Sequence, residues 1–277
     1  DDIVKTVAPN VKSQYIPHAV NSDIFKPIEN NEEFLQEYKK QDLGENYHPD
    51  KFVFFWNNRN ARRKQSGSLI FWFKKFLDKV GHDKACLIMH TDVKDPNGQD
   101  LHAIIKSLDL KNGEVLFSQE KVDLRKLSLM YNMADCTINI SDAEGFGLAT
   151  LESLSCGTPI IVNMTGGLQE QVTDGKNNFG IPIYPASKAI IGSQSIPWIR
   201  EDRLNEDDVV NAMEEIFNMS KDERKKMGQL GREHVMKNYN FDNFNNTWVD
   251  AMIKLHEEEG SWETRKYTKR WIVKEVK

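Results

Sequence analysis

The feature that most constrains the fold of this chain is the stretch 137–167, TINISDAEGFGLATLESLSCGTPIIVNMTGG. It begins with a short apolar, β-branched run and passes through a glycine turn into a helix-forming run at 148–155. Gly157 and Pro159 end that helix, and the apolar run at 160–162 predicts the next buried strand. A strand, a glycine turn, a helix and a second strand in this order are typical of a parallel α/β sheet.

The glycine turn predicts a binding site for an anion. It leaves the backbone N–H groups of Gly147, Leu148 and Ala149 at the N-terminus of a helix, where negative charge is favoured. Two carboxylates flank this position, because Glu144 precedes the helix and Glu152 lies about one turn inside it. A phosphate position with carboxylates for hydroxyl groups on either side suits a sugar nucleotide.

The run EGFGLATLE, followed by SCGTPIIV and TGG, resembles the signature of the retaining glycosyltransferases of family 4, also called glycosyl transferases group 1. Their motif has two glutamates separated by seven residues, and Glu144 and Glu152 have that spacing. A generic strand–turn–helix unit is the alternative, but the second glycine pair at 166–167 makes the run more specific. The resemblance covers roughly residues 15–255 and implies the GT-B fold.

In that fold, this chain would contribute the C-terminal donor-binding domain, a Rossmann-like doubly wound parallel sheet followed by C-terminal helices. The implied reaction transfers a sugar from a nucleoside diphosphate sugar, with UDP or GDP as the nucleotide, and retains the anomeric configuration. The acceptor, a glycan, lipid or protein, is not determined by the sequence. Glu144 would lie beside the donor sugar, and Glu152 would bind the ribose hydroxyls. The implied donor-binding residues are Gly145, Phe146, Gly147, Leu148, Ala149, Glu152, Thr165, Gly166 and Gly167.

A basic loop follows the predicted strand at 51–56. Its cations are Arg59, Arg62, Arg63 and Lys64, at the carboxyl end of the strand, where ligands bind in open α/β sheets. Taken alone, this loop reads equally well as a solvated basic surface. The resemblance assigns Arg59 and Lys64, together with Glu144, to catalysis, with both cations stabilising the departing diphosphate. The glycine that usually precedes the arginine is Asn58 here.

The order of predicted elements divides the chain into three parts. Residues 1–16 are interpreted as the remnant of a preceding domain, and 17–240 as the nucleotide-sugar-binding domain. Residues 241–277 are interpreted as a crossover helix and a basic tail. We therefore expect the N-terminal acceptor-binding domain to be absent from this chain, and the chain alone to show little transferase activity.

Three features leave alternatives open. The stretch 185–204 is longer than loops usual in such domains and could be a lid, an insertion or an irregular loop, of which we favour the last. Glu170 matches a recurrent family glutamate but could equally cap its own helix. The tail 257–277 could lie on a membrane surface, but docking on protein is the preferred interpretation.

Composition limits the function classes. The net charge of −5 argues against a general nucleic-acid binder, and the absence of an 18-residue apolar run excludes a membrane span. Cys86, Cys136 and Cys156 lie in or beside apolar runs, which predicts buried free thiols and a reducing compartment. We expect a cytoplasmic protein, with peripheral membrane association left open. The arrangement calls for no cofactor and no metal, and the chain has no Asp-x-Asp pair.

Two other functions fit the same fold. One is a GT-B sugar-nucleotide epimerase, which also binds a nucleotide diphosphate, although the ATLES sequence after the glycine turn fits the transferases better. The other is a non-catalytic sugar-nucleotide-binding domain, against which the intact glutamate pair and the cations argue. Hydrolysis of the donor would indicate a transferase, and scrambling of the stereochemistry at its C2 carbon would indicate an epimerase. Tight nucleotide binding without either reaction would indicate a binding domain.

Overall fold

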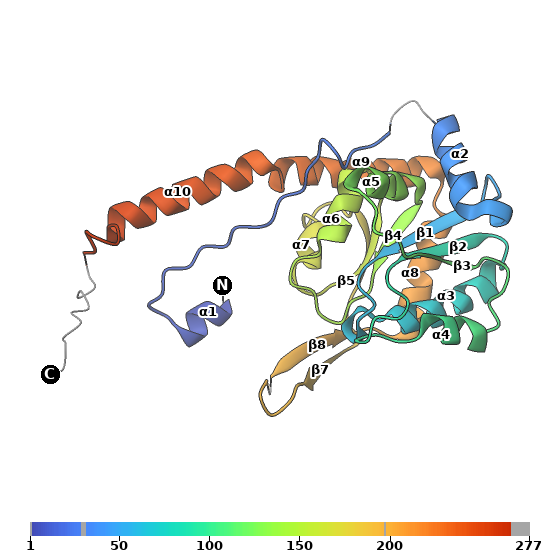
Figure 1. Cartoon of the computed structure of the whole chain (residues 1–277), viewed down its shortest axis with the longest axis horizontal. Helices are drawn as coiled ribbons and strands as arrows, with labels where there is room; N and C mark the ends of the chain where they lie inside the picture. The colour runs from blue at the N-terminus through green and yellow to red at the C-terminus, as the bar shows by residue number, and fades with distance from the viewer. Residues whose placement is uncertain (1, 29–31, 197, 267–277) are drawn as a thin grey trace. The chain divides into compact units, whose positions relative to one another are not determined.

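A computed structural model describes residues 2–28, 32–196 and 198–266 of the chain (Figure 1). It divides into two compact units. One comprises Val20–Asn238 and contains the sheet and the candidate site. The other comprises Asp1–Ala19 and Tyr239–Lys277.

The larger unit is built on one parallel sheet of six strands in the order β3-β2-β1-β4-β5-β6. The strands are β1 (Phe52–Asn57), β2 (Ala85–His90), β3 (Val115–Ser118), β4 (Cys136–Asn139), β5 (Ile160–Asn163) and β6 (Gly180–Ile183). The predicted doubly wound parallel sheet is therefore confirmed. The strand order reverses between β1 and β4, and ligands of such sheets bind at this switch point, outside the carboxyl ends of the strands.

Helices follow the strands along the chain, and several begin at side-chain caps. The helices of the larger unit are α2 (Glu32–Leu43), α3 (Ser66–Val80), α4 (Leu101–Ser107), α5 (Leu124–Met133), α6 (Leu148–Ser155), α7 (Leu168–Val172), α8 (Glu206–Asn218) and α9 (Lys221–Asn238), with short 3-10 turns η1 (Gly44–Asn46) and η2 (Arg62–Lys64). Asn205 caps α8, because its side chain accepts a 2.8 Å hydrogen bond from Asp208 N. Asp100 and Asp123 cap α4 and α5 in the same way.

The core fills both faces of the sheet, as the run FVFFW in β1 illustrates. Alternate side chains of a strand point to opposite faces. Phe54 packs against Phe73 and Phe76 of α3, with ring centroids 5.9 and 5.6 Å away, whereas Phe55 meets Tyr131 of α5 at 5.2 Å. A strand covered by helices on both faces has to be apolar at every position, which explains why β1 has no alternating pattern.

The stretch 185–204 is not an irregular loop, so the favoured expectation was wrong. It forms an antiparallel hairpin of β7 (Ser187–Ile191) and β8 (Ile199–Arg203), which extends away from the six-stranded sheet (Figure 1). Half of the side chains on its two strands are exposed and the one buried side chain is Glu201, so the sequence lacks the continuous apolar run by which the buried strands were predicted.

The smaller unit contains α1 (Asp2–Val7) and α10 (Phe241–Glu259). Ion pairs join its two segments, because Lys12 Nζ lies 2.6 Å from Glu258 and 2.5 Å from Glu259. The helix expected to begin at 241 is present, whereas Trp271 and most of the basic tail lie outside the described residues. No helix in the described part of the chain is long and apolar enough to cross a membrane.

The packing of α3 leads to a matched pair of substitutions on one helix. Phe76 is fully buried, whereas Phe71 is 41% exposed. We expect Phe76→Ala to lower the free energy of unfolding by about 3–5 kcal/mol, because it removes a core ring and leaves a cavity. Phe71→Ala should cost less than about 1 kcal/mol. Urea denaturation measures both, and equal losses would contradict the described core.

Candidate functional site

Two glycine turns meet at the carboxyl ends of β4 and β5. Gly166 has φ +49°, and a Cβ atom there would lie 1.6 Å from the carbonyl oxygen of Glu144. A Cβ at Gly167 would lie 2.6 Å from the carbonyl oxygen of Phe146. Gln171 of α7 reinforces this contact by donating a 2.7 Å hydrogen bond to Phe146 O. The two halves of the sequence motif, 144–152 and 165–167, therefore form one structure.

The first turn of α6 presents backbone N–H groups in the way the sequence predicts. Gly147 occupies the N-cap position with φ +91°, a conformation that other residues adopt only with strain. Among the described residues, no side chain caps this helix. A Cβ at Gly145 would meet nothing within 4 Å, so the outer side of the turn is open. The start of α6 can therefore receive an anion.

Glu144 and Lys64 form a partly buried ion pair across the switch point. Lys64 belongs to η2, in the loop after β1, and its ammonium group contacts Glu144 Oε2. The guanidinium of Arg63 lies 3.8 Å from Glu144 Oε1 and donates a 2.6 Å hydrogen bond to Ala143 O. Burial lowers the pKa of Lys64, and the charge of Glu144 opposes this shift. The contacts with Lys64 and Arg63 hold the Glu144 side chain in one orientation.

Glu152 lies at the end of a hydrogen-bonded chain that begins at β1. Asn57, the last residue of β1, donates from Nδ2 to the hydroxyl of Tyr131 at 2.8 Å. That hydroxyl in turn donates to Glu152 Oε2 at 2.8 Å. Burial raises the pKa of Glu152 to about 7, although the Tyr131 hydrogen bond favours the charged form. Sequence reasoning missed this contact between Tyr131 and Glu152.

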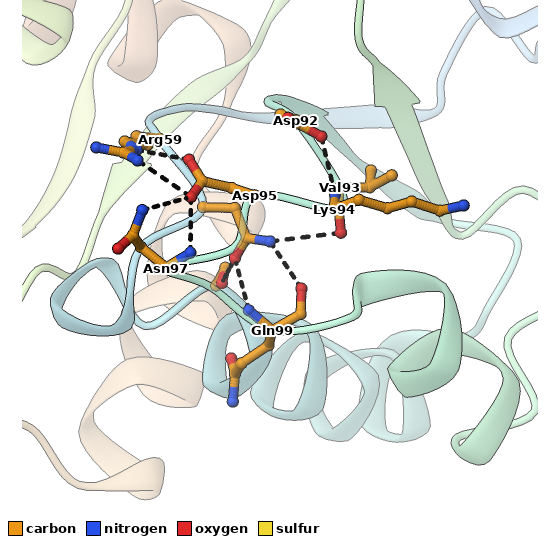
Figure 2. Close-up of polar contacts among 9 residues, drawn as sticks. Arg59, Asp92, Val93, Lys94, Asp95, Asn97 and Gln99 are labelled. Atoms are coloured by element: carbon orange, nitrogen blue, oxygen red, sulfur yellow. Dashed lines mark hydrogen bonds and ion pairs between the residues drawn. The ribbon is translucent and has the colours of Figure 1, made fainter.

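Arg59, in the loop after β1, joins a second polar cluster formed with the loop between β2 and α4. Its Nε lies 2.5 Å from Asp95 Oδ2 and its Nη2 3.2 Å from Asp95 Oδ1 (Figure 2). Asn97 also donates to Asp95 Oδ1 from its backbone N, at 2.8 Å. The Arg59 hydrogen bond holds the pKa of Asp95 well below its usual range. Arg59 is mostly exposed, and its described partner is Asp95, whereas Lys64 pairs with Glu144.

The base of the β7–β8 hairpin is joined to the site by charged contacts that sequence reasoning missed. Glu201, only 2% exposed, accepts hydrogen bonds from Arg62 and, at 2.5 Å, from Arg203 Nη2. Burial works to raise the pKa of Glu201, but Arg62 and Arg203 outweigh it and lower that pKa. Arg203 Nη1 also lies 3.3 Å from Asp142 Oδ2, which precedes the first glycine turn.

The second glycine turn is tied to the same hairpin. Thr165 donates from Oγ1 to Asp202 Oδ2 at 2.7 Å, and Asn163 donates from Nδ2 to Asp202 O at the same distance. The only sequence signal for these contacts was the charged run REDR at 200–203, in a stretch that was expected to be irregular. The hairpin is therefore fixed to the site at its base.

The structure thus brings most of the predicted site residues to one place. The glycine turns, Glu144, Lys64, Glu152 and Thr165 all lie at or beside the carboxyl ends of β1, β4 and β5. Among the described residues, no group of three or more His, Cys, Asp or Glu side chains could hold a metal ion. Cys86, Cys136 and Cys156 are buried and unpaired with one another, as predicted.

Comparison with known proteins identifies the family. The model of the family "Glycosyl transferases group 1" matches residues 38–234, so the chain belongs to this family. A D-inositol 3-phosphate glycosyltransferase of Catenulispora acidiphila is 34% identical over 77 residues, which are 28% of this chain and 18% of that protein. An N-acetyl-alpha-D-glucosaminyl L-malate synthase of Bacillus anthracis is 24% identical over 121 residues, 44% of this chain and 30% of that protein. The chain therefore matches less than a third of the length of these relatives.

Solved structures share the fold. A sucrose-phosphate synthase from Thermosynechococcus elongatus aligns with a TM-score of 0.71 at 19% identity, over 93% of this chain and 56% of that one. An Anabaena protein solved in complex with UDP and glucose aligns with a TM-score of 0.66 at 16% identity, over 87% of this chain and 57% of that one. The C-terminal domain of a glycosyl transferase group 1 family protein from Francisella tularensis aligns with a TM-score of 0.57 at 18% identity. The alignment covers 80% of this chain and 98% of that domain. The fold is thus that of GT-B glycosyltransferases.

The raised pKa of Glu152 predicts how stability depends on pH. The folded protein holds a proton on Glu152 up to about pH 7, whereas an unfolded glutamate releases it near its ordinary value. The folded state therefore binds more protons in this interval, so stability falls as pH rises through it. We expect Glu152→Gln to remove this loss and to gain on the order of 2 kcal/mol relative to wild type between pH 5 and pH 8.

Urea denaturation of wild type and Glu152→Gln at both pH values measures that difference. Glu214→Gln is the matched control, because Glu214 forms an exposed ion pair with Lys79 on the surface of α8 and α3. A pH-independent difference between Glu152→Gln and wild type would contradict the described environment of Glu152.

Proposed function

We propose that this chain is the donor-binding half of a retaining GT-B glycosyltransferase of family 4. It would bind a nucleoside diphosphate sugar, with UDP or GDP as the nucleotide, at the switch point between β1 and β4. One observation carries the proposal: the two glycine turns form a single anion-receiving structure with Glu144 and Glu152 beside it. The family match and the structures that share the fold support it.

The proposed roles follow from the geometry. The N–H groups at the start of α6 and the ammonium of Lys64 would receive the diphosphate. An ammonium has three donors, so Lys64 can bind a phosphate oxygen and keep its contact with Glu144. Glu152 would accept a ribose hydroxyl at Oε1, because Tyr131 already bonds to Oε2. Glu144 would bind hydroxyls of the donor sugar, in the orientation set by Lys64.

Arg59 would reach the diphosphate only by leaving or sharing its partner. Its guanidinium contacts Asp95 through two nitrogens, and a bidentate pair of this kind is directional. Because the side chain is 63% exposed, the pair is screened by water and costs little to break. We therefore propose that Lys64 binds the diphosphate directly and that Arg59 joins it when the donor arrives.

The reaction that suits this site is a front-face transfer. The bond between the anomeric carbon and the β-phosphate oxygen breaks, and the acceptor hydroxyl attacks from the same face of the sugar. The hydroxyl proton passes to the departing phosphate oxygen. Negative charge grows on the diphosphate as the bond breaks, so Lys64 and the N–H groups at α6 stabilise the transition state more than the ground state. Glu144 acts on the sugar hydroxyls and is not a nucleophile in this scheme.

The proposed site accounts for the donor side of the reaction, and the acceptor side needs further residues. The acceptor would be held by an N-terminal domain of the GT-B type, so we propose that the chain alone binds donor but turns it over poorly. None of the comparisons favours the epimerase alternative. The named curated relatives are a glycosyltransferase and a synthase, and the family model is one of transferases.

Calorimetric titration with UDP, GDP and ADP tests the donor site. We expect one of them to bind, and Glu152→Ala and Lys64→Ala each to weaken it at least ~10-fold, about 1.4 kcal/mol. Lys74→Ala is the matched control, because Lys74 pairs with Asp78 on the exposed side of α3. The nucleotide affinity of this variant should equal that of wild type. Binding that neither site substitution weakens would place the nucleotide elsewhere and contradict the proposal.

A further inference from the structure

The guanidinium of Arg63 lies at the start of the first glycine turn. Its Nη1 donates a 2.6 Å hydrogen bond to Ala143 O and lies 3.8 Å from Glu144 Oε1. The backbone of Arg63 is fixed at the same place, because Asp142 N donates a 2.8 Å hydrogen bond to Arg63 O. Arg63 is therefore tied to the residues immediately before the turn through both its backbone and its side chain.

Arg63 keeps most of its hydrogen-bonding capacity. A guanidinium has five N–H donors, and the acceptor of the Arg63 side chain among the described residues is Ala143 O. The side chain is 46% exposed, so water reaches the remaining donors and a ligand can replace that water. Arg59 differs, because two of its nitrogens are bonded to Asp95 (Figure 2). Of these two arginines, Arg63 is the one that lies at the glycine turn with donors to spare.

Two cations share the carboxylate of Glu144. Lys64 contacts its Oε2, and Arg63 lies beside its Oε1, so the three side chains together carry a net positive charge. Burial is the main cause of the lowered pKa of Lys64, and the charge of Arg63 lowers that pKa further because like charges repel. An anion bound at the start of α6 would offset this repulsion, so the pair of cations favours an anionic ligand.

We propose that Arg63 is a further catalytic residue, and that its guanidinium binds the β-phosphate of the nucleoside diphosphate beside Lys64. This inference rests on the proposed function. When the bond to the anomeric carbon breaks, its electron pair passes to the β-phosphate oxygen, and the two cations stabilise the charge that grows there. A guanidinium forms paired hydrogen bonds to two oxygens of one phosphate, which a single ammonium does not. Arg59 then adds to a diphosphate that these two cations already hold.

Calorimetric titration of the whole chain with UDP, UMP, GDP and GMP tests this role. We expect Arg63→Gln to weaken binding of the favoured nucleoside diphosphate at least ~10-fold, about 1.4 kcal/mol. The affinity for the corresponding monophosphate should hardly change, because that ligand has no β-phosphate. If Arg63 only supported the fold of the turn, its loss would weaken both nucleotides alike, so the ratio of the two affinities separates a contact with the diphosphate from a structural role.

Lys79→Gln is the matched control, because Lys79 is an exposed cation near the C-terminal end of α3 that pairs with Glu214. It should bind both nucleotides like wild type. Unfolding curves check that each variant folds. If Arg63→Gln does not fold, Arg63→Lys takes its place, and a loss selective for the diphosphate is again expected because the paired hydrogen bonds are gone.

Two sets of results would overturn the inference, and they differ in what they say of the donor site. An equal loss for monophosphate and diphosphate, or no loss in Arg63→Gln while Lys64→Ala still weakens the diphosphate, would remove the role of Arg63 and leave the donor site in place. If neither UDP nor GDP binds wild type, or if no substitution at the site weakens binding, the proposed donor site is wrong and the role of Arg63 falls with it.

Discussion

The close approach of the backbone at Gly166 to the carbonyl of Glu144 is the constraint on which the site depends. A side chain at Gly166 would have to occupy the position of that carbonyl, so the two turns can meet only because this residue has no Cβ. Their contact brings the start of α6 to the switch point of the sheet. It also sets the backbone of Glu144 where Lys64, from the loop after β1, can reach its carboxylate.

Burial gives the three carboxylates of this region different properties. Glu144 and Glu201 each have a cation in contact, and a buried charge without such a partner is costly. Glu152 has no cation in contact among the described residues and accepts a hydrogen bond from the Tyr131 hydroxyl, so burial raises its pKa to about 7. A ligand that brings hydroxyl groups to Glu152 would add donors that favour its charged form, so donor binding is expected to release a proton from this residue.

Much of the fold could be predicted because buried parallel strands are apolar at every position. The strands expected at 51–56 and 160–162 correspond to most of β1 and most of β5, and the helix expected at 148–155 is α6. The hairpin could not be predicted in this way, because exposed strands have no apolar run. The contacts of Glu201 with Arg62 and of Arg59 with Asp95 join distant segments, and nothing in the local pattern indicates them.

The central claim, that the two glycine turns form one nucleoside-diphosphate site, is tested most directly by the backbone amide NMR spectrum. Glycine amides resolve well, and each can be followed during titration with UDP or GDP. We predict that the amides of Gly147, Gly166 and Gly167 shift together and saturate at one ligand concentration, while those of Gly81 and Gly175 stay unchanged. Saturable shifts confined to other segments, or no shifts with either nucleotide, would contradict the account.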